Sequence, residues 1–304
     1  MRNDQADTLR QMAKSMKAKK RPATGAGSEG KGIRVIAVTS GKGGVGKSNV
    51  VVNLAICLAR RGKRVLVIDA DLGVGNIDVL LGISAPYTLD HVFTGEVSIS
   101  DIILDGPCGI KLIPAGSGVQ EYTHLSAMDQ LRLMDELDQL EEHYDLVLID
   151  TAAGISENVT YFITDAQEVV VVASPEPTSI TDVYALIKLL ATRYNERSFH
   201  VLVNMVNDSK DALEVFARLC NVTTRFLDVS LDYLGFVLWD DRLMDAVKQQ
   251  RAVCDLHPHA ASTGCFQNLA RRIADQNVPN RLKGNMQFFF RQKYAAPSAG
   301  MERL

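Results

Sequence analysis

Cysteine is sparse in this chain of 304 residues, tryptophan occurs once, and long apolar runs are absent. No run approaches the roughly 20 apolar residues that span a bilayer, and the polar N-terminus lacks the apolar core of a secretory signal. The cysteines form no Cys-x-x-Cys pair, which argues against a disulfide framework, a zinc site or an iron–sulfur cluster. We therefore expect a cytoplasmic protein with buried free thiols at Cys57, Cys108, Cys220, Cys254 and Cys265.

Neither sign of charge is in large excess: the chain has 33 basic and 36 acidic residues, and its net charge is −3. This balance gives no global attraction to polyanions, so direct nucleic-acid binding is not predicted. A hydrophobic fraction of 46% is enough for one large α/β core or two small domains.

Composition divides the chain into three zones. Residues 1–32 hold a short basic helical stretch followed by a glycine-rich linker. Residues 33–277 alternate apolar strand patterns with helical ones, and residues 278–304 surround three phenylalanines with basic side chains. Such alternation predicts an α/β fold with a mainly parallel sheet and helices on both faces. The expected strands are 33–39, 64–69, 110–114, 145–150, 168–174, 199–205 and 233–239.

The strongest motif follows the first expected strand and precedes an expected helix at 49–60. It matches the phosphate loop G-x-x-x-x-G-K-[ST], in which backbone N–H groups and a helix N-terminus hold a polyphosphate. In this motif Lys47 neutralises phosphate oxygens and Ser48 ligates Mg²⁺. The residues of the loop are Gly41, Lys42, Gly43, Gly44, Val45, Gly46, Lys47 and Ser48.

Two aspartates stand at the ends of expected strands, where ligands gather in open α/β sheets. Asp71 ends the run VLVIDAD and is expected to hold the attacking water in line with the γ-phosphate. Asp150 precedes a glycine turn, DTAAG, and is expected to hold Mg²⁺ directly or through water. The phosphate loop comes first in the sequence, Asp71 second and Asp150 third, which is the order expected of a nucleotide hydrolase. Asn204 follows a late strand without the lysine of a guanine-reading motif, which favours adenine; the alternative is that Asn204 merely ends a strand.

Together, Lys42 within KGGVGKS, the run DADLGVGNID and the run DTAAG resemble the MinD/ParA family of deviant-Walker P-loop ATPases. The resemblance implies ATP and Mg²⁺ as cofactors and slow ATP hydrolysis stimulated by dimerisation and lipid. It also implies a homodimer in the ATP-bound state, in which Lys42 reaches the partner's phosphates. Lys42, Lys47 and Asp71 are the catalytic residues on this view. A lysine contributed in trans would couple hydrolysis to dimerisation.

Within that family, the strings DQADTLR, EPTSITDVYALIKLL, VNMV and RFLDV are similar to the FlhG/FleN regulators of flagellar number. The resemblance implies that the N-terminal element activates the GTPase FlhF by presenting Gln5. It further implies the flagellar master transcription activator and the flagellar switch-complex proteins as partners. The partner-activating residues are Asp4, Gln5, Ala6, Leu9 and Arg10.

The C-terminal zone resembles the family's membrane-targeting helix, and its pattern agrees with an interfacial helix. Basic residues flank one apolar face, the composition of helices that lie on anionic lipid. One copy should bind lipid marginally, and two copies held in an ATP dimer should bind better through effective concentration. We expect reversible residence on the inner face of the cytoplasmic membrane, with the cell pole as one location. The membrane residues are Leu282, Met286, Phe289 and Phe290.

Three alternatives stay open at this point. The first is an ATPase that positions division sites or DNA, which would use the same ATPase domain on other cargo. An iron–sulfur carrier of the nitrogenase type would need cysteines near the glycine turn, and DTAAG holds none. A non-enzymatic scaffold would leave Lys47, Asp71 and Asp150 without a purpose.

The C-terminal zone has an alternative of its own, in which its phenylalanines pack on the protein's own core.

Overall fold

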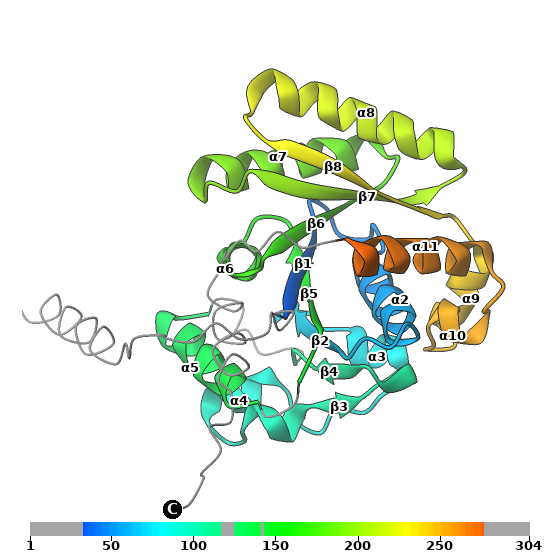
Figure 1. Cartoon of the computed structure of the whole chain (residues 1–304). Helices are drawn as coiled ribbons and strands as arrows, with labels where there is room; N and C mark the ends of the chain where they lie inside the picture. Colours follow the sequence, from blue (N-terminus) through cyan, green and yellow to red (C-terminus); the bar gives the residue numbers. More distant parts are fainter. Residues whose placement is uncertain (1–32, 117–124, 141–142, 277–304) are drawn as a thin grey trace, which may run out of the picture. The chain divides into compact units, whose positions relative to one another are not determined.

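A computed structural model describes residues 33–116, 125–140 and 143–276, in which strands and helices alternate (Figure 1). Seven strands match the expected ranges to within three residues at each end. The exception among the described strands is β3, which has two residues and pairs antiparallel with β4, too short for a sequence pattern to predict. The strands are β1 (Arg34–Ser40), β2 (Val65–Ala70), β3 (Leu104–Asp105), β4 (Lys111–Ile113), β5 (Leu146–Ala153), β6 (Glu168–Ala173), β7 (Ser198–Val206) and β8 (Ser230–Leu238).

These strands form one sheet in the order β3-β4-β2-β5-β1-β6-β7-β8. All neighbours run parallel except β3 and β4, which confirms the expectation of a mainly parallel sheet. The central strand β1 lies between β5 and β6 and continues directly into the phosphate loop. Because the strands are parallel, the loops that follow β1, β2, β5 and β7 meet at one edge of the sheet, where ligands bind in such folds.

Helices cover both faces of this sheet, as the sequence predicts. One group packs with α2 and the other around α6, and Figure 1 shows α2, α10 and α11 together on one side of the strands. The helices are α2 (Lys47–Ala59), α3 (Ile77–Leu81), α4 (Leu89–Thr94), α5 (Ala127–Asp138), α6 (Glu157–Asp165), α7 (Pro177–Arg193), α8 (Ser209–Phe226), α9 (Asp241–Lys248), α10 (Val253–Leu256) and α11 (Ala261–Asp275), with 3₁₀ turns η1 (Ile99–Ile102) and η2 (Pro107–Gly109).

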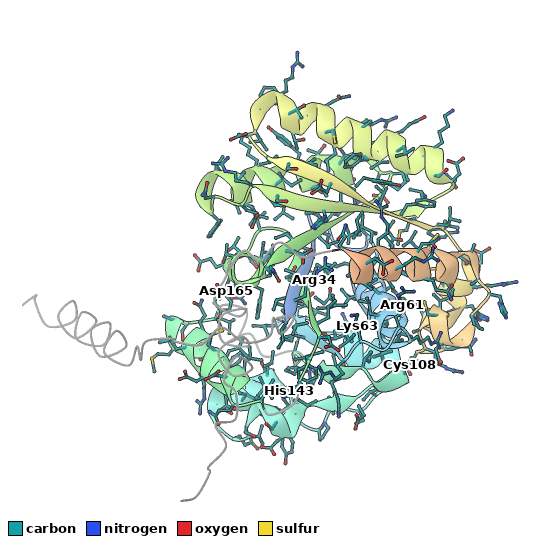
Figure 2. The ribbon with its side chains drawn as sticks, viewed as in Figure 1. Arg34, Arg61, Lys63, Cys108, His143 and Asp165 are labelled. Atoms are coloured by element: carbon teal, nitrogen blue, oxygen red, sulfur yellow. The ribbon has the colours of Figure 1, made fainter. Side chains whose placement is uncertain are left out.

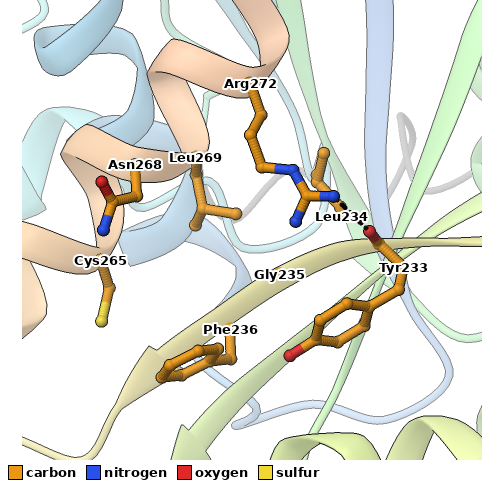
Figure 3. Close-up of a pocket in the computed structure, with 8 residues that line it drawn as sticks. All are labelled: Tyr233, Leu234, Gly235, Phe236, Cys265, Asn268, Leu269 and Arg272. Atoms are coloured by element: carbon orange, nitrogen blue, oxygen red, sulfur yellow. Dashed lines mark hydrogen bonds between the residues drawn. The ribbon is translucent and has the colours of Figure 1, made fainter. Parts of the chain in front are cut away.

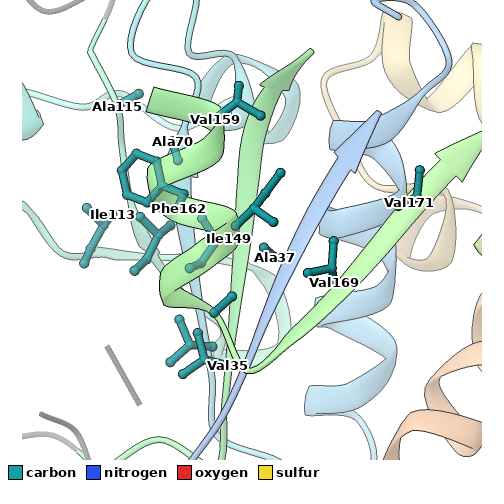
Figure 4. Packing of buried hydrophobic residues seen from close by; sticks show 14 of the residues in the cluster. Val35, Ala37, Ala70, Ile113, Ala115, Ile149, Val159, Phe162, Val169 and Val171 are labelled. Carbon is teal, nitrogen blue, oxygen red and sulfur yellow. The ribbon is translucent and has the colours of Figure 1, made fainter. Parts of the chain in front are cut away.

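The two faces are built by alternation along each strand. In β1, Val35 and Ala37 point to the face covered by α6, while Ile36 and Val38 point to the face covered by α2. Figure 4 shows the first face, where the ring of Phe162 lies among side chains of the sheet. Phe162 is fully buried, and its truncation to alanine would cost about 3–5 kcal/mol.

A buried ion pair fastens the opposite edge of the sheet, where β1 and β6 begin. Arg34, labelled in Figure 2, donates from Nε and Nη2 to the two carboxylate oxygens of Glu168 at 2.5 and 2.6 Å. The same guanidinium also donates to the carbonyl of Ile273 and, at 3.2 Å, to Oε1 of Gln276. Arg34 therefore holds the end of α11 against the first strand.

The expectation of buried free thiols is only partly right. Cys57, Cys254 and Cys265 are buried and unbridged, as expected. Cys108, however, is exposed, because it lies in the surface turn η2 with a left-handed backbone (φ 59°), and Cys220 is half-buried on α8.

Candidate nucleotide-binding site

The phosphate loop has the backbone that its glycines predict. Gly44 and Gly46 adopt left-handed φ values of 82° and 79°, a region that favours glycine. Gly46 is also hemmed in, because a Cβ there would lie 2.5 Å from Nδ2 of Asn204. Helix α2 begins at Lys47, two residues before the expected start, and no side chain caps its first N–H groups. Those uncapped donors and the helix dipole fit a polyphosphate.

Lys47, Ser48 and Asp150 meet at the start of α2, as the sequence predicts. The Nζ atom of Lys47 lies 2.5 Å from Oδ1 of Asp150, and both side chains are buried. Burial raises the pKa of the Asp150 carboxyl, although the Lys47 ammonium and a hydrogen bond from the Ser48 hydroxyl act in the opposite direction. A buried carboxylate beside a hydroxyl suits a hard cation such as Mg²⁺, which prefers oxygen ligands. Their roles toward phosphate and metal stay predictions.

Strand β5 is longer than expected, because Ala153 still pairs with β1 opposite Ser40. The glycine turn therefore begins at Gly154, whose φ is 91° and whose N–H donates to the carbonyl of Ser40 at 2.9 Å. This hydrogen bond links the DTAAG turn to the residue just before the phosphate loop. A displacement of the DTAAG turn would therefore strain or break its hydrogen bond to Ser40.

Asp69 is a site residue that sequence reasoning missed. It lies beside Asp150 in the β2–β5 register and accepts hydrogen bonds from the N–H groups of Asp71, Asn76 and Ile77 at 3.0–3.1 Å. Burial, with repulsion from Asp150, raises the pKa of Asp69 to about 7. Asp69 thus anchors both ends of the loop that carries Asp71. The signal was present in the sequence, since Asp69 belongs to the same apolar run that leads to Asp71.

Asp71 follows β2 and is partly exposed at the same edge of the sheet. Its Oδ1 accepts the N–H of Val74 at 3.3 Å, and its charge contributes to the raised pKa of Asp150. Val74 and Ile155, which flank Asp71 and the glycine turn, are 62% and 54% exposed. Both apolar side chains are therefore open to solvent in the single chain.

Asn204 does not end its strand, because β7 continues to Val206. The side chain is buried and donates from Nδ2 to the carbonyl of Val45 in the phosphate loop at 2.8 Å. The next residue, Met205, has a left-handed φ of 61°, and the β7–β8 register shifts there. Asn204 thus braces the loop, and its proposed contact with adenine stays a prediction. A small pocket next to it is lined by Gly46, Asn49, Asn204, Met205, Leu238, Trp239, Asp240, Leu243 and Met244.

Lys42 lies at the surface of the loop, with its side chain 40% exposed. Its Nζ contacts Oε2 of Glu176 at 2.5 Å and Oγ1 of Thr178 at 3.2 Å. The pKa of Glu176 is lowered by the hydrogen bond from Lys42. The start of α7 is packed closely here, since a Cβ on Gly41 would lie 2.3 Å from the backbone of Asp182. In the single chain, Lys42 is therefore held by its own α7.

A larger cavity of about 120 Å³ lies elsewhere, between β8 and α11 (Figure 3). Arg272 lies across it and donates from Nη2 to the carbonyl of Tyr233 at 3.2 Å. None of its lining residues belongs to the phosphate loop or the DTAAG turn. They are Tyr233, Leu234, Gly235, Phe236, Cys265, Asn268, Leu269 and Arg272.

Two observations limit what the described residues can hold. No group of three or more His, Cys, Asp or Glu side chains in residues 33–116, 125–140 and 143–276 is placed to bind a metal ion. A metal at Ser48 and Asp150 would therefore need oxygens from the nucleotide, as is usual for Mg²⁺. Within the same residues no helix has the length and apolarity to cross a bilayer.

The predicted partner and membrane elements lie outside the described residues. They are Asp4, Gln5, Ala6, Leu9 and Arg10 near the N-terminus and Leu282, Met286, Phe289 and Phe290 near the C-terminus. The zone boundaries at 32/33 and 277/278 stay predictions as well.

Comparison with known sequences finds relatives over most of the chain. A family model described as an AAA domain matches residues 33–201. The antiactivator FleN of Pseudomonas aeruginosa is 43% identical over 268 residues, which cover 88% of this chain and 96% of that protein. The flagellum site-determining protein YlxH of Helicobacter pylori is 32% identical over 263 residues, which cover 85% and 89%.

Comparison with solved structures gives the same fold. A chain of the MinC:MinD cell division protein complex of Aquifex aeolicus aligns with a TM-score of 0.66 at 25% identity, covering 83% of this chain and all of that one. The septum site-determining protein MinD of Pyrococcus horikoshii, complexed with Mg-ADP, aligns with a TM-score of 0.63 at 23% identity, covering 80% and 96%. The eight-stranded sheet with flanking helices is therefore the MinD fold.

Proposed function

This chain belongs to the MinD/ParA family of P-loop ATPases, and we propose that it is an ATP-dependent dimerising switch that regulates the number and placement of flagella. The observation that carries the flagellar part is the 43% identity with antiactivator FleN, which extends over 88% of this chain. A relation that covers 96% of that protein supports a shared role more strongly than a match to the ATPase core alone.

The site supports ATP hydrolysis through residues that are already together. Ser48 and Asp150 would hold Mg²⁺, whose positive charge stabilises phosphate oxygens. Lys47 would turn from Asp150 to the phosphates, which leaves a buried carboxylate in need of another cation. We therefore expect nucleotide to bind with a divalent cation rather than alone. Asp71 would hold the attacking water, on the loop that Asp69 anchors.

Dimerisation would use the surface next to Asp71. Val74 and Ile155 give it exposed apolar area, and Lys42 gives it a cation that reaches beyond the loop. To contact a partner's phosphates, Lys42 must leave Glu176. The ion pair with Glu176 therefore competes with dimerisation, and a nucleotide that attracts Lys42 more strongly tips the balance toward the dimer.

We further propose the partners that the FlhG/FleN resemblance implies. They are the GTPase FlhF, through Gln5, the flagellar master transcription activator, the flagellar switch-complex proteins and anionic lipid of the inner membrane. The lipid contact would use the apolar face that includes Phe289 and Phe290. Direct contact with nucleic acid is not part of this proposal.

The test is a count of flagella and of misplaced septa per cell after Lys47→Ala at the native locus. A matched control is Lys248→Ala, which removes an exposed lysine at the end of α9. Extra or misplaced flagella with normal septa in the Lys47 variant alone would support the proposal. Normal flagella with minicells or lost DNA would instead assign this ATPase to cell division or DNA partition, the alternative that the MinD similarity favours.

A further inference from the structure

Two buried cysteines from distant parts of the chain meet behind the phosphate-loop helix. Cys57 lies in the last turns of α2 and Cys254 in α10, with exposed fractions of 4% and 0%. Their Sγ atoms are 3.3 Å apart, the distance of two thiols in contact. A disulfide has an S–S length of about 2.05 Å, so an approach of roughly 1.3 Å would close the bond.

Hydrogen bonds on both sides of the sulfurs hold the two helices in this position. The side-chain oxygen of Asn53, one turn before Cys57, accepts the N–H of Cys254 at 3.0 Å. The guanidinium of Arg60, which follows α2, donates to the carbonyl of Cys254 at 2.5 Å and contacts Asp255 at 3.3 Å. The backbone of Cys254 is thus hydrogen-bonded once to α2 and once to the residue that follows α2, and these contacts hold the two sulfurs together.

The surroundings distinguish the two thiols. A hydrogen bond from Cys254 lowers the pKa of Cys57 in spite of burial, and the charge of Arg60 acts in the same direction. The pKa of Cys254 is raised, by the same hydrogen bond and by burial. Arg60 also donates from Nε to Sγ of Cys108 at 3.3 Å, and Cys108, labelled in Figure 2, is exposed. Arg60 therefore connects the buried pair to a surface thiol.

We propose that Cys57 and Cys254 form a dithiol site that hydroperoxides oxidise to a disulfide joining α2 to α10. The Cys57 thiolate attacks one peroxide oxygen and the O–O bond breaks. The leaving oxygen takes up the proton that the Cys57 thiol lost, which gives a sulfenic acid at Cys57 and water or an alcohol. The Cys254 thiol then attacks that sulfur, the S–O bond breaks, and water leaves with the proton. One peroxide is reduced by two electrons for each disulfide formed, and two equivalents of an external thiol restore the pair while they are themselves oxidised to a disulfide.

The bond would join α2 to α10, and chain segments close to both helices line the pocket beside the phosphate loop. Helix α2 contributes Asn49 to the pocket, and the segment that leads to α10 contributes Trp239, Leu243 and Met244. We expect oxidation to restrict the movement of these two segments relative to each other and so to slow the release of bound nucleotide. This consequence rests on the proposed function, whereas the formation of the bond does not.

The test counts thiols in a background that lacks the two accessible cysteines. The variant Cys108→Ser with Cys220→Ser keeps three of the five cysteines, namely Cys57, Cys254 and Cys265. The folded protein is treated with hydrogen peroxide, quenched, unfolded in urea and titrated for free thiols. The matched control adds Cys57→Ser, which leaves two cysteines and no partner for Cys254.

We expect the count to fall from three to one in the background variant and to stay at two in the control. Mass spectrometry of the unreduced digest should show the Cys57 and Cys254 peptides joined, and dithiothreitol should restore three thiols. A count that stays at three, or a joined peptide that contains Cys265, would overturn the site. Release of a fluorescent ADP analogue at the same rate before and after oxidation would overturn only the coupling to the pocket.

Discussion

The pair of Arg34 and Glu168 allows a quantitative prediction about stability. Burial alone would raise the pKa of Glu168. The hydrogen bonds from Arg34 and His200 outweigh burial and lower this pKa from 4.5 to about 2. A difference of about 2.5 pKa units corresponds to roughly 3 kcal/mol of stability at neutral pH. Since Glu168→Gln also leaves the buried guanidinium of Arg34 without its counter-charge, we expect a loss of about 3–5 kcal/mol.

The assay is urea unfolding at pH 7, where this loss should lower the midpoint by about 1 M or more for a slope near 3 kcal/mol/M. The matched control is Glu214→Gln, which removes an exposed i,i+4 partner of Arg218 at 3.8 Å. That exposed pair should contribute less than about 0.5 kcal/mol.

The pH dependence has a definite sign. The carboxyl of Glu168 has a lower pKa in the folded chain than in the unfolded one, so its contribution is fully present above about pH 4.5. It is lost as the pH falls from there toward about 2. The difference between wild type and Glu168→Gln should therefore be present at pH 7 and shrink below pH 4.5. A difference under 1 kcal/mol at pH 7, or one that does not shrink in acid, would refute this account.

Three further predictions concern the nucleotide site and the C-terminal zone. Gly46→Ala places a Cβ 2.5 Å from Asn204 at a φ of 79°, so it should abolish the fluorescence change of Trp239, the sole tryptophan, on addition of Mg-ATP. Gly264→Ala, in open space on α11, should retain that change, and a full response of the Gly46 variant would contradict the packing. Asp71→Ala should cut ATP turnover about 100-fold or more and trap the ATP dimer in size-exclusion chromatography, whereas Asp78→Ala on α3 should not; a monomeric, active Asp71 variant would refute the proposed role. Anionic liposomes should sediment the full chain more with ATP than without, and a chain ending before Pro279 should stay in the supernatant; sedimentation that ignores the truncation would rule out the anchor.

Local patterns predicted much of this molecule. Apolar β-branched runs gave seven of the eight described strands, because a buried parallel strand needs little besides such a run. The phosphate loop was equally predictable. Its backbone has φ values near 80° at two positions, and the sequence places glycine, the residue that tolerates such values, at both. Lys47, Ser48 and Asp150 could be placed together because parallel strands end at one edge of the sheet.

Other features depended on contacts that no local pattern contains. The hydrogen bond from the Asn204 amide to the carbonyl of Val45, 159 residues away in sequence, is one such contact. The raised pKa of Asp69 arises from burial beside Asp150, which only the pairing of β2 with β5 creates. The ends of strands were also set by pairing, as Ala153 shows opposite Ser40.

The sequence by itself determined the family, the class of fold and the chemical identity of the phosphate-binding residues, because each is written in a short run of neighbouring residues. Only the tertiary structure decided which distant groups meet: Lys42 with Glu176, Arg34 with Glu168, and Cys57 with Cys254. The physical reason is that the strand order and the helix packing bring together residues more than 130 positions apart. Periodicity predicts which face of each element is buried, and the packing of the whole domain decides what that face touches.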